Sequence, residues 1–455
     1  MSAILDRLEP QVREALEAGQ LVSLREVLTE QHSADIADVL ERLDSEQQYQ
    51  VFQLLEPEQA SEVLNEMGGE TTRELLTRMP VEDVGDLLDQ MPMDDAVEIL
   101  TEDVPELQEE LLAAMEAEDA AEVQRLLQYP PQSAGLMMTE KFVHVHKDMT
   151  AAQALAYIRE VDEEVETVAN VYIVDKEAFK LIGVLSLREI ITHPPEDLIE
   201  DFMITQLITV SPETDQEFVA RTVARYNFLA IPVVDETMTL LGIITVDDII
   251  DVLVEENTED ILRFGAVEST GADQPYFTIP LSRVLRSRFG WLLLLMVADT
   301  LTGTVLRLFD AQLAAVVQLS FYIPLLIGTG GNTGAQTVST IIRGLAIHDI
   351  RFGDILHVLR REFLSGLLLG IALSIVAAAR SYTWDGDINL ALTIGISIIA
   401  ICTWANVMGS LIPMIAHRVG IDAAVVSAPM ISTLVDATGL FIYLSIAGLL
   451  LAGRI

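Results

Sequence analysis

Apolar residues recur at helical spacing from about residue 20 to residue 129, and proline or glycine interrupts them every two or three turns. The interruptions fall at Glu56-Pro57, Gly68-Gly69, Met79-Pro80, Met91-Pro92 and Val104-Pro105. Proline removes a backbone donor and ends a helix, so the pattern predicts short stacked helices. We place them at 34–43, 60–67, 81–91, 94–100 and 120–127. Such an array forms a solenoid, and its plainest interpretation is an interaction scaffold.

The hydrophobic period changes after Gly135, where β-branched runs alternate with helical ones. The predicted order is strand, helix, strand, strand, helix, at 139–146, 151–159, 168–175, 180–186 and 187–192. The same order recurs at 204–211, 218–226, 230–235, 240–245 and 247–254. The sequence therefore predicts two consecutive copies of one β-α-β-β-α unit.

The last 180 or so residues contain five long apolar stretches, near 289–309, 313–341, 363–381, 390–416 and 423–452. Each has the roughly 20 residues that a helix needs to cross about 30 Å of hydrocarbon. The acidic segment that precedes them, 252–278, is too hydrophilic to cross a bilayer and is expected to be a helical connector. The sequence thus predicts a five-helix transmembrane domain.

Charge is divided unevenly between the two halves of the chain. The net charge is −43, yet residues 277–455 hold 11 Arg, no Lys and 9 acidic residues, so that half is near +2 and residues 1–276 are near −45. A polyanion of this size repels nucleic acid and anionic lipid and attracts cations. The single cysteine, Cys402, offers neither a disulfide framework nor a zinc cluster.

The chain is expected to sit in the inner (plasma) membrane with its N-terminal half in the cytoplasm. Residues 1–30 are charged and lack the apolar core of a secretory signal. With that orientation, eight arginines of the membrane half fall on the inner side and three on the outer side, as the positive-inside rule requires. The C-terminus is then expected outside.

Asp436, in the segment STLVDATGLFIYL, lies near the middle of the last apolar stretch. A carboxylate at that depth costs at least about 2.5 kcal/mol on insertion scales and usually marks an ion path or a paired site. The alternative is a carboxylate neutralised by burial or bonded to a neighbouring helix. Asp299, in the first stretch, is a second intramembrane acid. We interpret it as a side chain that contacts Thr300 or Thr302.

The second apolar stretch contains GTGGNTGAQ, with Gly330, Gly331, Asn332 and Gln336 as candidate pore-lining residues. Glycines permit close helix packing, and freed carbonyls coordinate cations only where they line a cavity. Mg²⁺ prefers oxygen ligands and keeps its water, which suits Asp436. A homodimer would place two such carboxylates around one axis.

Two sets of motifs resemble known families. AIPVVD with LLGIITVDDI, and VYIVD with LIGVLSLREI, resemble the two copies of a tandem CBS module. GTGGNTGAQ, ANVMGSLIP and TLVDATGLFIYLS, together with the domain order, resemble the MgtE family of magnesium channels and transporters. The resemblance implies a multidomain membrane protein, with an acidic α-helical solenoid N-domain (1–134), α/β CBS domains (135–199 and 200–253), an amphipathic connector or plug helix (254–278) and a five-helix pore domain (279–455).

By this resemblance the protein is expected to be a Mg²⁺-selective, Mg²⁺-gated homodimeric channel for passive uptake, with Asp436 as the ion-selecting residue. The implied regulatory Mg²⁺ ligands are Asp422, Glu62, Asp94, Glu98, Glu217, Asp248, Asp251, Glu256, Glu259 and Asp260. ATP is an implied ligand of the CBS module, with Tyr172, Arg188 and Phe228 as candidate contacts.

Other functions stay open at this point. The same architecture could carry Mn²⁺, Co²⁺ or Ca²⁺, could exchange its cation for sodium, or could be a CBS-based membrane sensor without transport. A mid-membrane aspartate argues against the sensor. The sequence contains no nucleophile elbow and no GxxxxGK[ST] loop, so we expect no enzyme activity and no nucleic-acid partner.

Overall fold

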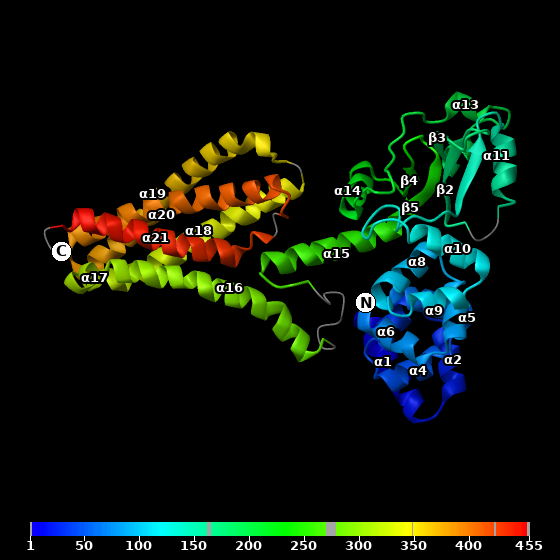
Figure 1. Cartoon of the computed structure of the whole chain (residues 1–455), viewed down its shortest axis with the longest axis horizontal. Helices are drawn as coiled ribbons and strands as arrows, with labels where there is room; N and C mark the ends of the chain where they lie inside the picture. The colour runs from blue at the N-terminus through cyan, green and yellow to red at the C-terminus, as the bar shows by residue number, and fades with distance from the viewer. Residues whose placement is uncertain (1, 162–164, 270–278, 348, 423–424, 453–455) are drawn as a thin grey trace. The chain divides into compact units, whose positions relative to one another are not determined.

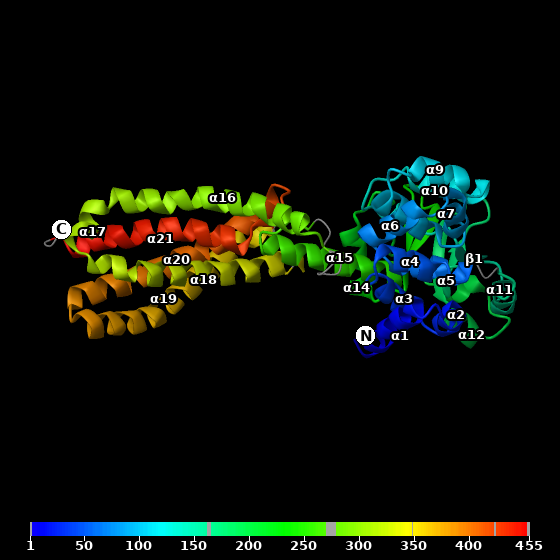
Figure 2. The ribbon, with the colours of Figure 1, turned by 90° about the horizontal axis from the view of Figure 1, so that it is seen from below.

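The computed structural model describes residues 2–161, 165–269, 279–347, 349–422 and 425–452. It divides into two compact units, and the division falls inside helix α15 (Val246–Phe264), after Glu256. We describe each unit by itself (Figures 1 and 2).

The first unit begins with a stack of short helices. They are α1 (Ser2–Glu17), α2 (Leu21–Thr29), α3 (Ser33–Leu40), α4 (Ser45–Phe52), α5 (Pro57–Glu66), α6 (Gly69–Arg78), α7 (Val81–Leu88), α8 (Met93–Glu98), the π-helical turn η1 (Ile99–Asp103), α9 (Gln108–Ala114) and α10 (Ala117–Leu126). Local signals set the starts: Asp44 accepts hydrogen bonds from the first free amides of α4, and Pro57 is the first residue of α5. The predicted helical solenoid is confirmed.

Two small sheets follow the helical stack. In the first, β1 (Phe142–His146) pairs in parallel with β2 (Thr167–Val174), which pairs antiparallel with β3 (Leu181–Ser186). In the second, β4 (Ala230–Val234) pairs antiparallel with β5 (Leu240–Thr245). The accompanying helices are α11 (Ala151–Ile158), α12 (Leu187–Thr192), α13 (Ile199–Phe202) and α14 (Gln216–Tyr226). The tandem CBS architecture is confirmed.

One predicted strand did not form. The segment 204–211 pairs only through two isolated bridges, Val184 with Ile204 and Val210 with Val233. Pro212 follows the segment directly, and Val210 is the one buried residue among these eight, so the run lacks the alternating buried face of a sheet strand. The second sheet therefore has one fewer strand than the first.

A single apolar core joins the helical stack to the second CBS copy. It runs from α1 to α10 and continues into buried Val219, Ile231 and Ile249. Because burial of apolar surface is the main stabilising term, this shared core fixes the helical stack against the CBS module. The first CBS copy has its own core, which includes Val145, Ile173 and Ile190.

The second unit consists of long helices with short connections. They are α16 (Leu281–Leu308), α17 (Asp310–Ala315), α18 (Gln318–Ala346), η2 (Phe352–Asp354), α19 (Ile355–Asp385), α20 (Ile388–Arg418) and α21 (Ala428–Leu450). In the described part of the chain four segments are long and apolar enough to cross a membrane: 281–308, 352–385, 388–418 and 428–450. Helix α18 is as long, but its polar glycine-rich centre leaves it outside this group.

Glycines bring the long helices into close contact. A β-carbon at Gly409 of α20 would lie 2.8 Å from the carbonyl oxygen of Gly334 of α18 and 3.1 Å from the Thr337 β-carbon. A β-carbon at Gly366 of α19 would lie 2.9 Å from the carbonyl oxygen of Cys402. Small residues at crossings let membrane helices approach and pack.

We predict that Gly409→Ala lowers the melting temperature of the detergent-solubilised protein, because the added methyl group meets backbone and costs about 1–3 kcal/mol of overpacking. Gly303→Ala on α16 is the control, since nothing lies within 4 Å of a β-carbon there. Equal melting temperatures for the two variants would contradict the close crossing of α18 and α20.

Candidate cation sites

Asp436 of α21 faces the glycine-rich part of α18. A β-carbon at Gly331 would contact the Ser432 hydroxyl and lie 3.3 Å from Asp436 Oδ1. Asp436 Oδ1 is buried and has no hydrogen-bond partner within the described chain. The missing side chain of Gly331 therefore provides the room in which this carboxylate sits. An unpaired buried carboxylate oxygen is costly unless a proton or a cation compensates it.

The candidate pore residues of α18 divide into two groups. Gly330 and Gly331 are buried against neighbouring helices, and a β-carbon at Gly330 would lie 2.6 Å from Ile401 Cγ2. Asn332 and Gln336, one helical turn apart, are exposed in the single chain. Two polar side chains on the surface of a membrane helix require water or another chain beside them.

A buried hydrogen-bond chain joins three of the long helices. The Thr337 hydroxyl donates to Asn406 Oδ1 at 3.0 Å, and Asn406 Nδ2 donates to Glu362 Oε2 at 3.1 Å. Asn406 is 2% exposed, so its amide depends on these two partners. The chain fixes α18, α20 and α19 beside the proposed pore residues, and sequence analysis did not identify it.

In the first unit, four acids gather between α8 and the start of α15. Asp94 and Asp95 begin α8, Glu98 ends it, and Asp248 lies in the first turn of α15. Asp94 is 8% exposed, and its Oδ1 has no hydrogen-bond partner among the described residues. Asp248 accepts a hydrogen bond of 2.8 Å from the Thr245 hydroxyl, which orients that carboxylate.

Burial and mutual repulsion raise the pKa of each of these acids. Burial first, and Asp248 next, hold the pKa of Asp94 well above its ordinary range and raise the pKa of Asp95 to about 8. Burial raises the pKa of Asp248 to about 7. The pKa of Glu98 is also raised to about 7, by desolvation from the surrounding chain and by the charges of Glu102 and Asp103, although the residue is exposed at the surface of the single chain. A carboxyl group that repels its neighbours near neutral pH gains most from a divalent cation.

Acids around the cluster show the same effect to a smaller degree. Burial, followed by the charge of Asp251, raises the pKa of Glu66, and burial followed by Asp247 raises the pKa of Asp251 and of Glu166. Of these, only Asp251 was predicted from the sequence. The doublets Asp94-Asp95 and Asp247-Asp248, each in the first turn of a helix, were the available sequence signal.

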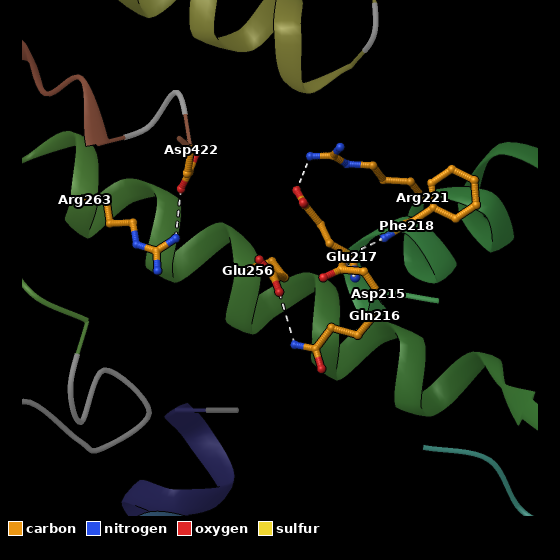
Figure 3. Close-up of polar contacts among 8 residues, drawn as sticks. All are labelled: Asp215, Gln216, Glu217, Phe218, Arg221, Glu256, Arg263 and Asp422. Atoms are coloured by element: carbon orange, nitrogen blue, oxygen red, sulfur yellow. Dashed lines mark hydrogen bonds and ion pairs between the residues drawn. The ribbon is translucent and has the colours of Figure 1, made fainter. Parts of the chain in front are cut away.

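The remaining predicted ligands have other partners. Glu62 accepts a hydrogen bond of 2.6 Å from Ser33, Glu217 pairs with Arg221 on α14, and Glu256 accepts one of 3.1 Å from Gln216. Figure 3 shows the last two contacts.

Three more predicted ligands lie in the second unit. Glu259 pairs with Arg263 on α15, and Arg263 also reaches Asp422 at 2.8 Å, as Figure 3 shows. Asp260 lies on the same helix. The Arg263–Asp422 pair and the packing of Phe264 against buried Val426 and Ile431 attach the end of α15 to the long helices.

No group of three His, Cys, Asp or Glu side chains converges on one point within the described residues. The acids of α8 and α15 are therefore close but not yet arranged as a complete ligand set. Their chemistry nevertheless fits Mg²⁺, which takes carboxylate oxygens and retains several waters.

The candidate nucleotide contacts are not all on one surface. Arg188 lines an open cleft of about 630 Å³ together with Ser186 and Leu229. Tyr172 is 1% exposed and packs in the core shared by the two CBS copies, edge-on to Phe142. Phe228 is partly buried and stacks on Tyr226.

Most of the chain is similar to known proteins. The family model described as "Divalent cation transporter" (MgtE) matches residues 323–446, that of the MgtE intracellular N domain matches 31–132, and that of the CBS domain matches 134–196 and 199–255. The magnesium transporter MgtE of Thermus thermophilus is 42% identical over 331 residues, 73% of each chain. That of Bacillus subtilis is 37% identical over 336 residues, 74% of this chain and 73% of the relative.

Two solved structures resemble the first unit. The cytosolic domain of the Mg²⁺ channel MgtE in complex with ATP is 35% identical, with a TM-score of 0.51, and the match covers 54% of this chain and 99% of that one. The soluble part of a magnesium transporter is 31% identical, also with a TM-score of 0.51, covering 55% and 99%.

We predict that the part of the chain before the division, residues 1–256, loses stability without Mg²⁺ as the pH rises from about 6 to about 8.5. In the unfolded chain the acids ionise near about pH 4 and hold no protons across this window. The folded state alone holds protons on Asp95, Glu98 and Asp248, whose pKa values are about 8, 7 and 7, so rising pH removes them from the folded state only.

The melting temperature in a chelator should therefore fall by several degrees over this range, at roughly 2–4 °C per kcal/mol for a unit of this size. Millimolar Mg²⁺ should flatten the dependence, and so should the double variant Asp95→Asn/Asp248→Asn. A melting temperature that stays level or rises in chelator would contradict the described burial of these acids.

Proposed function

Because the chain belongs to the MgtE family of divalent cation transporters, we propose that it is a Mg²⁺-selective channel or transporter for passive uptake. We propose further that Mg²⁺ binding to the acids of its cytosolic part closes it. The observation that carries the first proposal is the unpaired, buried oxygen of Asp436, next to the glycines of α18. A fully dehydrated Mg²⁺ would need a cage of oxygens, whereas a hydrated one needs only concentrated negative charge.

The arrangement of the long helices supports an ion path that runs along the surface of one chain. We propose that α18 is a fifth membrane span, because its 29 residues suffice to cross the bilayer. Its exposed Asn332 and Gln336 would then face a water-filled path that a second copy completes. No residue of α16 is buried within the chain, so lipid and the second copy together would cover that helix.

Closure by Mg²⁺ follows from the electrostatics of α8 and α15. Without the cation, Asp94, Asp95 and Asp248 repel one another, and a divalent ion between them favours the compact arrangement. Helix α15 is the element on which this change acts, since its first turn carries Asp248 and its last turn contacts Asp422 through Arg263. By this proposal Glu62, Glu98, Glu217, Asp251, Glu256, Glu259, Asp260 and Asp422 add to the field that attracts regulatory ions.

ATP is a secondary proposal for the CBS module. A relative's cytosolic domain was solved in complex with ATP, and here Arg188 lines the open cleft in which a phosphate could be held. Ser186 and Leu229 lie on the same cleft wall, whereas Tyr172 packs in the core.

We predict that Asp436→Asn lowers Mg²⁺ uptake into proteoliposomes at least about tenfold, because the site loses the charge that attracts a divalent ion. Asp385→Asn, an acid near the end of α19 that bonds to Tyr322, serves as a matched control and should keep most of the uptake. Competition by Mn²⁺, Co²⁺ and Ca²⁺ in the same assay identifies the cargo. Undiminished uptake by Asp436→Asn would exclude this carboxylate from the ion path.

We predict that Asp94→Asn/Asp248→Asn weakens inhibition by internal Mg²⁺, since the variant lacks the charges that the closing ion bridges. The concentration for half-inhibition should rise about tenfold, measured as uptake by vesicles loaded with increasing Mg²⁺. The control is Asp83→Asn/Asp86→Asn, which removes two exposed acids of α7. Identical inhibition curves for the two double variants would refute closure through α8 and α15.

A further inference from the structure

Helix α16 carries a carboxylate within an otherwise apolar run. Asp299 is its one acidic residue, and its side chain is exposed in the single chain. A charged side chain facing lipid at this depth is strongly unfavourable, so membrane acids face a bundle interior or a water-filled cavity. The exposure of Asp299 therefore requires a polar neighbour that the apolar residues of α16 do not supply.

The hydroxyl groups beside Asp299 do not neutralise it. The Thr300 hydroxyl donates to the Val297 carbonyl oxygen at 2.6 Å, and the Thr302 hydroxyl is buried without a hydrogen-bond partner. The contact with either threonine that the sequence suggested is therefore not made. Within the described chain no hydrogen bond or ion pair reaches Asp299, so its charge is uncompensated.

The packing of α16 on α21 places Asp299 near the level of Asp436. The two helices lie side by side in both views (Figures 1 and 2), and the rings of Phe309 and Phe441 meet with centroids 5.8 Å apart. Counted back from this contact at 1.5 Å per residue, the two aspartates differ by about 7.5 Å along the helix axes.

The two aspartates lie on adjacent helices with a small axial offset, so their carboxylates repel each other when both are ionised. A proton or a cation between them relieves that repulsion.

We propose that Asp299 is a second selectivity-determining carboxylate, which acts with Asp436 on the cation in the membrane. The inference rests on the proposed function, because it assigns a further residue to the same ion path. A further carboxylate from each chain concentrates more negative charge on the path, and this favours a divalent over a monovalent cation. Gly331 leaves room beside Asp436 on the α18 side, and Asp299 comes to the same region from the adjacent helix α16.

The test is cation flux through the purified full-length protein in liposomes. Asp299→Asn should raise the Mg²⁺ concentration for half-maximal flux about tenfold and lower the Mg²⁺ to Na⁺ flux ratio, as expected when one unit charge leaves the site of a divalent ion. Asp299→Glu keeps the charge and should stay near wild type. Asp310→Asn, which removes an exposed acid at the start of α17, is the matched control.

Size-exclusion profiles establish that each variant is folded, and Asp299→Ser provides a second neutral variant if Asp299→Asn aggregates. The inference is overturned if the wild type conducts Mg²⁺ and Asp436→Asn impairs it, while both neutral Asp299 variants keep the wild-type affinity and flux ratio. A wild type that carries no Mg²⁺ would instead overturn the proposed function, and this inference with it.

Discussion

Carboxylates held away from water without a basic partner are the physical constraint common to both units of this protein. In the membrane unit the group is Asp436, with one oxygen buried and unpaired. In the first unit it is the set of acids on α8 and the start of α15, of which Asp94 has a buried, unpaired oxygen. Each buried carboxylate lowers the free energy of unfolding unless a proton or a cation neutralises its charge. Mg²⁺ suits both places because it takes oxygen ligands and keeps part of its water.

Close packing of the chain places these carboxylates where they are. In the membrane unit Gly331 leaves room for Asp436, and Gly409 and Gly366 let α20 approach α18 and α19. The chain from Thr337 through Asn406 to Glu362 then holds the three helices in register. In the first unit one continuous apolar core packs the helical stack against the second CBS copy, and Asp94 at the edge of that core is buried with it. Apolar packing thus brings like charges close together, and a bound cation reduces the repulsion between them.

Much of this could be predicted from the sequence, because the signals are local. Proline and glycine breaks delimited the short helices, repeated β-branched runs revealed the paired CBS copies, and long apolar runs revealed the membrane helices. The strand at 204–211 failed because pairing depends on a partner register that the run itself does not encode. The acidic cluster was predicted only in part: Asp95, Glu66 and Glu166 matter through tertiary burial, which one sequence does not reveal. Likewise, Tyr172 was a candidate nucleotide contact, but it is buried in the core that the two CBS copies share.

The most direct test of the central claim is the number of protons released when Mg²⁺ is added to the full-length protein in weakly buffered solution. If buried acids hold protons for want of a cation, Mg²⁺ must displace them near pH 7, where the pKa values of Glu98 and Asp248 lie. Proton release is expected to be largest near about pH 7 and to disappear above about pH 9. Saturable Mg²⁺ binding with no proton release at any pH would contradict it.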